Sequence, residues 1–405
     1  MKSSGVFKKI TIFTLLTLVI IPNVITDMNN LVKFNEDNLI LWNLKVPSMY
    51  IEWNPSGTML VAITYTSLTL ISFEGKIIDT IQDINVQSAS WNRNDYLAFT
   101  YWSKEEDIYY LAIYEPGKGI ISKFPLAEVR GGHIKWSPDG KNIILYTGRE
   151  ILMINLMNST LTIKKEIELP LPGTLGFSWS NNGTKLAITG QWNVFVFTKD
   201  LEIYKKIYFG KLFPPEHLAW SPDDKYIAVG GREGYVCIVD SNSGDIVSCI
   251  KVRYKSGIRD IVWVSKNILI AGDYEDYVHF LKIENDNIYE INRIRLDIPH
   301  FHCFALHPSR EYIAISLYDR IILYNVSKLM HTQQAISTVA SIITSTIIKT
   351  VSITKTMTIT RTITKTLSSK YVKEESIGFT WEFTISLIIA LSFVILGVIL
   401  GRFKR

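Results

Sequence analysis

Short apolar stretches separated by turn-forming residues run through the middle of the chain. In residues 133–148, HIKWSPDGKNIILYTG, the sequence Ser-Pro-Asp-Gly divides two stretches rich in apolar residues. Ser, Pro, Asp and Gly favour tight turns, whereas β-branched residues such as isoleucine favour strands. The pattern therefore predicts a β-hairpin in this segment.

This hairpin pattern recurs at a nearly constant interval. The residue two positions before the anchor of each copy is apolar, so that both share one face of a strand. A fixed period of this length is typical of a repeat architecture, in which neighbouring units share a core. The seven copies are spaced by 38 to 45 residues and are anchored on Trp53, Trp91, Trp136, Trp179, Trp220, Trp263 and Leu306.

Each repeat also contains two further strand-like stretches. In the fifth repeat, KYIAVGG and YVCIVD are followed by the turn SNSGD and then by IVSCIKV. Four short strands in a repeat of about 42 residues are typical of a β-propeller blade. We predict an all-β fold, a seven-bladed β-propeller over residues 37–326, with the anchor tryptophans wedged between neighbouring blades.

The last repeat has only three strands of its own, ending with RIILYNV. A further strand-like segment, NLILWNLK at residues 38–45, precedes the first repeat. We expect this segment to complete the last blade, because such a closure removes the free sheet edges that favour aggregation.

The repeats resemble the WD-repeat and YVTN group of seven-bladed propellers. The WSPDG-type sequences at Trp136 and Trp220 carry the resemblance most clearly. The Trp-Asp pair that ends the third strand of a typical WD repeat is absent, as in VCIVDS and IILYNV. The resemblance implies a divergent propeller, in which the Ser/Thr-His-Asp hydrogen-bond network of the family is not assured.

Both ends of the chain carry apolar segments outside the repeats. Residues 1–26 combine three lysines with the apolar run 10–21, which is the arrangement of a signal peptide or signal anchor. Residues 383–401 are uncharged and would extend about 28 Å as a helix. We predict one transmembrane helix over residues 381–401 and a basic cytoplasmic tail, residues 402–405, with the propeller on the extracellular side of the cell membrane.

A Thr/Ile-rich segment, residues 332–376, separates the repeats from this apolar segment. From Thr354 to Thr366 every second residue is threonine, which is a strand period and not a helical one. The segment is interpreted as an extended, O-glycosylated stalk, as in surface proteins of thermophilic archaea, which it resembles in composition. The alternative is a strand that pairs with copies of itself and gives self-association through the stalk.

Candidate chemistry in the repeats is sparse. The residues three positions before the anchors include His133, His217 and Asp260, which we expect to line the channel or one rim as candidate binding residues. Two histidines and a carboxylate are a conceivable metal set, but they lie in three different repeats. No catalytic trio and no phosphate-binding loop is recognisable, so we predict no catalytic residue, no metal and no cofactor.

Cysteines and glycosylation sequons indicate whether the propeller is exported to an oxidising compartment. Cys237 and Cys249 lie on the two strands of one predicted hairpin, so a disulfide is expected if they are in register. Cys303 is expected to be a buried apolar residue. The sequons at Asn158, Asn182 and Asn325 are candidate N-glycosylation sites on an exported domain.

These features together favour a non-enzymatic scaffold at the cell surface. Its loops would bind a protein or a glycan, and the C-terminal helix would anchor it in the lipid bilayer. A net charge of +5 over 405 residues does not indicate a nucleic-acid partner. The alternatives are an exported propeller enzyme, hydrolytic or redox, with a site at the channel mouth, and an intracellular scaffold if the N-terminal run is no signal.

Overall fold

The structure is a computed structural model, and its described residues all lie in the first of two compact units of the chain, Met1–Thr332. The predicted export signal, stalk, transmembrane helix and basic tail lie outside the described residues. Within them, no helix is long and apolar enough to span a membrane. The described residues are 39–126, 132–147, 149–157, 160–168, 176–210, 212–252, 256–296 and 299–330.

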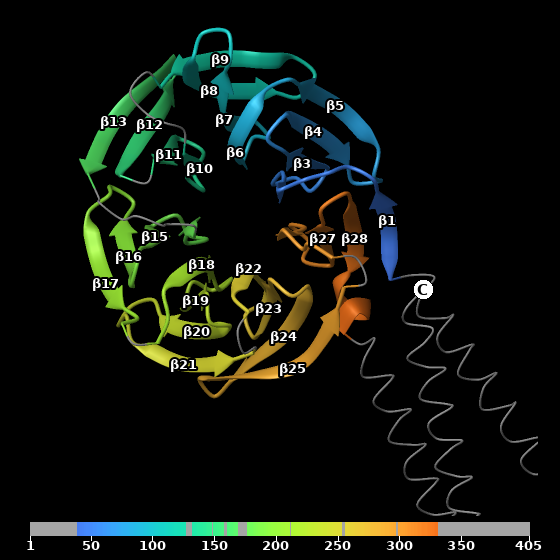
Figure 1. Cartoon of the computed structure of the whole chain (residues 1–405). Helices are drawn as coiled ribbons and strands as arrows, with labels where there is room; N and C mark the ends of the chain where they lie inside the picture. The colour runs from blue at the N-terminus through green and yellow to red at the C-terminus, as the bar shows by residue number, and fades with distance from the viewer. Residues whose placement is uncertain are drawn as a thin grey trace, which may run out of the picture. The chain divides into compact units, whose positions relative to one another are not determined.

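The described chain forms seven antiparallel four-stranded sheets that are arranged as blades around a central axis (Figure 1). Each of the first three blades runs outward from an inner strand to an outer strand in chain order. Their strands are β2 (Tyr50–Trp53), β3 (Met59–Ile63), β4 (Ser67–Ser72) and β5 (Ile77–Gln82) in blade 1; β6 (Asn85–Trp91), β7 (Leu97–Ser103), β8 (Ile108–Glu115) and β9 (Gly119–Pro125) in blade 2; and β10 (His133–Trp136), β11 (Asn142–Tyr146), β12 (Glu150–Met157) and β13 (Thr160–Glu168) in blade 3.

The remaining blades repeat this plan, so the predicted all-β, seven-bladed propeller is confirmed. Their strands are β14 (Phe177–Trp179), β15 (Lys185–Thr189), β16 (Asn193–Thr198) and β17 (Ile203–Tyr208) in blade 4; β18 (Pro215–Trp220), β19 (Tyr226–Gly231), β20 (Tyr235–Asp240) and β21 (Ile246–Lys251) in blade 5; β22 (Ile258–Ser265), β23 (Ile268–Asp273), β24 (Tyr277–Glu284) and β25 (Asn287–Arg295) in blade 6; and β26 (Cys303–Leu306), β27 (Tyr312–Ser316), β28 (Ile321–Asn325) and β1 (Ile40–Leu44) in blade 7.

The ring closes through the N-terminal strand, as the sequence predicts. β1 pairs with β28 and becomes the outer strand of blade 7. The Trp42 indole N–H donates to the Phe73 carbonyl oxygen of blade 1 at 2.8 Å. The first described strand thus contacts both blades at the closure.

The anchor tryptophans join neighbouring blades. Four of the six indole N–H groups donate to the carbonyl oxygen that precedes the anchor of the previous blade: Trp53 to Ala305 at 3.2 Å, Trp91 to Glu52 at 3.1 Å, Trp220 to Ser178 at 3.0 Å and Trp263 to Ala219 at 3.0 Å. The indole N–H groups of Trp136 and Trp179 are buried and have no partner in the described chain. All six tryptophan anchors have an exposed fraction of 9% or less. A buried indole that also satisfies a neighbouring backbone carbonyl fixes the angle between two sheets.

Each outer strand contains an irregularity at an equivalent place. The register between the third and the outer strand shifts by one residue in all seven blades of the described chain. Such bulges twist an exposed edge and discourage pairing with other chains. In five of the blades the extra residue is a large exposed apolar one: Leu41, Ile78, Ile121, Tyr204 and Ile291.

Candidate functional site: the loop face of the propeller

The propeller has two faces that are formed by different connections. The turn face carries the hairpins between inner and second strands and those between third and outer strands. The loop face carries the connections between second and third strands, and those that lead from an outer strand to the next inner strand. Loops held by a rigid scaffold are common places for binding residues, so each face is a candidate.

The turn face uses its polar residues to hold itself together. In six of the seven blades, the residue after the anchor accepts a backbone N–H within its own hairpin: Asn54, Asn92, Ser137, Ser180, Ser221 and His307. The Asp224 carboxylate also accepts from the backbone N–H groups of Asn181 and Asn182 in the neighbouring blade, at 2.7 and 2.9 Å. These side chains therefore form hydrogen bonds that stabilise the propeller itself.

A depression of about 260 Å³ lies on the turn side of the channel. It is bordered by Trp220, Trp263 and Arg310 from blades 5, 6 and 7. The Arg310 guanidinium donates to the Trp263 carbonyl oxygen at 2.8 Å, and the two tryptophans are buried. The residues that line the depression are thus used in contacts between neighbouring blades.

The loop face differs in exposing large aromatic side chains. Tyr65, Trp192, Tyr274 and Tyr318 lie in connections between second and third strands, and their exposed fractions are 65%, 39%, 49% and 69%. Tyr208, the last residue of β17, is 69% exposed. Exposed Tyr and Trp side chains are enriched where proteins bind partners, because each offers a large apolar area at a low entropic cost.

Bulges in three inner strands lie at the loop face. The register of the inner strand skips Gln87 in blade 2, Glu216 in blade 5 and Arg259 in blade 6. The Gln87 side chain accepts the Gly132 N–H of the next blade at 3.0 Å, and the buried Glu216 carboxylate pairs with Arg232. Bulges commonly change where a side chain points, and here they direct polar groups to the mouth of the channel.

Arg259 has a different environment from the other bulge residues. Its guanidinium Nη2 donates to His302 Nδ1 of blade 7 at 2.9 Å. Its Cζ atom lies 5.0 Å from the centre of the Tyr274 ring, within the range of a cation–π contact. Arg259 is half-buried and forms no ion pair with a carboxylate of the described chain.

The comparisons with known proteins agree on this architecture. A family model described as "Anaphase-promoting complex subunit 4 WD40 domain" matches residues 214–266, which include blade 5 and the inner strand of blade 6. Comparison with curated proteins found no match to the chain.

Several solved structures share the fold at low sequence identity. A chain from "Crystal Structure of Mitotic Checkpoint Complex" is 12% identical, with a TM-score of 0.62, over 71% of this chain and 92% of that chain. The Cps50 (Swd1) β-propeller domain of Myceliophthora thermophila is 12% identical, with a TM-score of 0.58, over 70% and 99%. A chain from "Structure of U3-55K" is 10% identical, with a TM-score of 0.59, over 71% and 98%.

The fold is that of a seven-bladed β-propeller. Seven four-stranded blades, closed by an N-terminal strand, agree with the solved structures on this, and blade 5 is similar to a WD40 domain. Identities of 10 to 12% show the fold alone, so the binding properties of this propeller have to be argued from its own residues.

The three candidate binding residues lie in the loop-face halves of three inner strands, β10, β18 and β22, and their role in binding stays a prediction. His133 begins β10, and the imidazole Nε2 of His217 is buried with no hydrogen-bond partner in the described chain. Burial lowers the pKa of His217 to about 4, and the nearby Arg259 contributes. No group of three or more His, Cys, Asp or Glu among the described residues is arranged to hold a metal ion.

Asp260 connects two blades of the propeller. Its carboxylate accepts the N–H of Ile261 at 2.8 Å and the N–H of Phe304, in blade 7, at 2.7 Å. Burial raises the pKa of Asp260 to about 6, although these two hydrogen bonds oppose the rise. Both oxygen atoms are therefore occupied by backbone donors.

A polar cluster spans the channel wall beside blade 2. Lys135 of blade 3 reaches across blade 2 to blade 1, where its ammonium pairs with Glu52 and lies 2.6 Å from the Tyr50 hydroxyl. The Glu52 carboxylate also accepts the Trp91 N–H at 3.3 Å. Burial, followed by the nearby Glu52 charge, raises the pKa of Tyr50 well above its usual range. Spacing along the sequence does not predict this contact, because it joins residues 83 positions apart.

A second buried polar group lies within blade 6. His279 is fully buried, with Nδ1 2.7 Å from a Glu290 carboxylate oxygen and Nε2 3.3 Å from an Asp273 oxygen. Burial lowers the pKa of His279, but the two carboxylates outweigh that effect and hold it above its ordinary value. This cluster joins strands of one sheet, and only the Glu290 side chain is partly exposed, at 25%, so we interpret it as structural.

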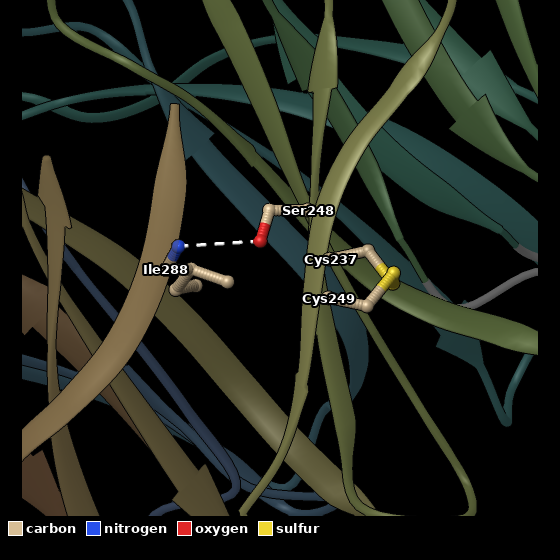
Figure 2. The surroundings of a disulfide bond; sticks show 4 residues. All are labelled: Cys237, Ser248, Cys249 and Ile288. Carbon is tan, nitrogen blue, oxygen red and sulfur yellow. Dashed lines mark hydrogen bonds between the residues drawn. A yellow bond between two sulfur atoms is a disulfide. The ribbon is translucent and has the colours of Figure 1, made fainter. Parts of the chain in front are cut away.

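Cys237 and Cys249 are directly opposite each other in β20 and β21, and their sulfur atoms are joined in a disulfide (Figure 2). The outer-strand bulge places them in register, because the pairing shifts by one residue between Ile238 and Val239. The adjacent Ser248 points the other way, and its hydroxyl oxygen accepts the Ile288 N–H of blade 6 at 3.3 Å (Figure 2). Cys303 is a buried free cysteine, and burial raises the pKa of its thiol.

The sequons fall in different settings. Asn182 is exposed in the inner hairpin of blade 4, where its side-chain oxygen accepts the Thr184 N–H at 2.9 Å. Asn325 is the last residue of β28 and is half-buried. Asn158 lies outside the described residues, so glycosylation stays a prediction at all three positions.

Proposed function

We propose that this propeller is a non-enzymatic scaffold that binds a protein partner through its loop face. The observation that carries the proposal is the set of exposed aromatic side chains on that face, Tyr65, Trp192, Tyr208, Tyr274 and Tyr318. Aromatic anchors dominate the energetics of protein interfaces. The polar groups of the turn face are occupied by contacts within the propeller, so that face offers fewer anchors.

We further propose that the propeller acts outside the cell, tethered to the membrane. The disulfide between Cys237 and Cys249 supports an oxidising compartment, where such bonds persist. The apolar terminal segments and the Thr/Ile-rich segment of the sequence support export, an anchor in the lipid bilayer and a stalk with a capacity for self-association. A surface glycan is the alternative partner, since exposed aromatic rings also stack on sugars.

Crosslinking on intact cells tests the proposed partner. The full chain, carrying an affinity tag, is crosslinked at the cell surface and purified, and the captured molecules are identified by mass spectrometry. We expect one protein to be enriched over a control with the unrelated tag alone. Recovery of a glycan, or of no molecule at all, would contradict a protein-binding scaffold.

Protease treatment of whole cells tests the location. We expect added protease to cleave the propeller while a cytoplasmic marker stays intact. Complete protection of the propeller in intact cells, with cleavage after lysis, would place it inside and overturn the proposed location.

A further inference from the structure

The loop-face mouth of the channel contains one arginine whose charge is not neutralised within the described chain. Arg232 pairs with the buried Glu216, and Arg320 pairs with Asp319 at 2.9 Å. Arg259 is held only by His302 and by the Tyr274 ring. Partial burial raises the free energy of a cation that has no carboxylate partner, so an external anion that paired with it would be bound favourably.

The contacts of Arg259 leave most of its hydrogen-bonding capacity free. A guanidinium has five N–H donors, and His302 Nδ1 accepts one of them. Because Nδ1 of His302 is the acceptor, its proton lies on Nε2, which is a further donor. The Tyr274 ring beside the guanidinium restricts its orientation, so the remaining donors are presented in a fixed plane.

The nearby carboxylates do not compete for this arginine. The Asp260 oxygens are occupied by the N–H groups of Ile261 and Phe304. In the neighbouring loop, Asp276 Oδ1 accepts the Phe301 N–H at 2.9 Å. The Asp260 carboxylate is thus satisfied by backbone donors, and neither acidic group forms an ion pair with Arg259 in the described chain, so the guanidinium is left for an external acceptor.

A planar fork of donors beside an aromatic ring matches the geometry of a carboxylate. Arginine binds carboxylates with two parallel N–H···O bonds, which are stronger than neutral hydrogen bonds. The exposed aromatic rings around the mouth would contact the apolar parts of the same partner. The Tyr274 ring lies against the Arg259 guanidinium, and the Tyr318 ring packs against the His300 ring, with ring centres 5.8 Å apart.

We propose that Arg259 and His302 form a carboxylate-binding site, which holds an Asp or Glu side chain of the protein partner with Tyr274 as its apolar wall. This site rests on the proposed protein-binding function and names the chemistry that the partner must present. It lies at the junction of blades 6 and 7, where the bulge in β22 places Arg259 beside the first residues of blade 7.

Peptide binding tests the site directly. Fluorescein-labelled hexaglutamate and hexaglutamine are titrated into the full-length protein in detergent micelles, and fluorescence anisotropy is recorded. We expect hexaglutamate to bind and hexaglutamine not to bind. Arg259→Gln should weaken hexaglutamate binding at least about tenfold, because a charge-assisted pair is lost.

A matched variant controls for general electrostatic attraction. Arg320→Gln removes the same charge from the same face, but the guanidinium of Arg320 is already paired with Asp319. We expect it to leave hexaglutamate binding within about twofold of the wild type. Thermal unfolding of both variants checks that the propeller is intact.

Two outcomes would overturn the carboxylate site: equal binding of the two peptides, and equal weakening by the two arginine variants. Binding of an oligogalacturonate in place of hexaglutamate would overturn the protein side chain as its occupant. The result also separates this site from the proposed function. If Arg259→Gln captures the crosslinked protein partner as well as the wild type does, the scaffold proposal holds and the carboxylate site is wrong. If no partner is captured but the two peptides bind as expected, the carboxylate site holds and the scaffold proposal is wrong.

Discussion

The two faces of the propeller use similar short connections for different purposes. On the turn face, side chains such as Ser137 and Ser221 accept backbone N–H groups of their own hairpins. On the loop face, Tyr65 and Tyr318 are more than half exposed. The turn face thus fixes each hairpin, whereas the loop face leaves large side chains available for contacts.

This difference separates stability from binding. Buried residues of the inner strands and hydrogen-bonding residues of the turn face lie in contacts between or within blades, so changing them should lower the stability of the propeller. Exposed residues of the loop face should contribute less to folding, since much of each side chain is in contact with water. Substitutions on the two faces should therefore differ in their effect on stability.

Removing a buried anchor should have the largest effect. Trp220 is 6% exposed and donates to Ser178 of blade 4. Trp220→Ala should lower the free energy of unfolding by about 3–5 kcal/mol, because it leaves a cavity and an unpaired carbonyl. Urea unfolding measures the difference, and the loop-face variant Tyr274→Ala is the control.

Tyr274→Ala should change the free energy of unfolding by about 0.5 kcal/mol or less. Similar losses in the two variants would mean that the loop face also holds the propeller together. The contrast between the faces would then be wrong.

Removing the disulfide should have the next largest effect. Reduction of Cys237 and Cys249, or their joint replacement by alanine, should lower the free energy of unfolding by about 2–4 kcal/mol. Urea unfolding with and without reductant measures it, and Cys303→Ala serves as a control that keeps the reductant response. If reductant leaves the unfolding of the wild type unchanged, the bond is absent from the folded protein.

Asp260 should show a smaller effect that depends on pH. Because burial raises its folded pKa from 3.8 to about 6, its stabilising contribution is complete below pH 3.8 and is lost as the pH rises through 6. Asp260→Asn keeps an acceptor without a charge, so its stability relative to the wild type should increase as the pH rises from about 4 to about 7. Asp260→Ala leaves the Phe304 N–H unpaired and should lose about 1–3 kcal/mol.

Thermal or urea unfolding at several pH values measures both Asp260 variants. A pH-independent difference between Asp260→Asn and the wild type would show that this carboxyl group titrates normally in the folded state.

The sequence predicted those features that depend on local periodicity. Turn residues after each anchor and period-two alternation located the hairpins. The strand-like segment at residues 38–45, which lies outside the repeats, indicated how the ring closes. These signals are local, because one hairpin contains both the strands and the turn that joins them. The buried tryptophans followed from the same pattern.

The candidate site was less predictable, because it depends on bulges. The sequence directed attention to residues three positions before the anchors, such as Asp260, whereas the bulge in β22 places the neighbouring Arg259 at the mouth of the channel. The alignment of Cys237 with Cys249 likewise depends on a bulge. A one-residue register shift leaves no clear mark in the hydrophobic pattern, and contacts between blades join residues that are far apart in sequence.

A comparison of partner capture by two matched triple variants tests the central claim most directly. One carries Tyr65→Ser, Tyr274→Ser and Tyr318→Ser on the loop face; the other carries Ile77→Ser, Ile120→Ser and Ile203→Ser, which remove equally exposed apolar residues from the outer strands near the turn face. After crosslinking on intact cells, we expect the loop-face variant to capture the partner at least about tenfold less well than the wild type, with unchanged thermal unfolding. The outer-strand variant should capture it normally; loss of capture in that variant alone would contradict binding through the loop face.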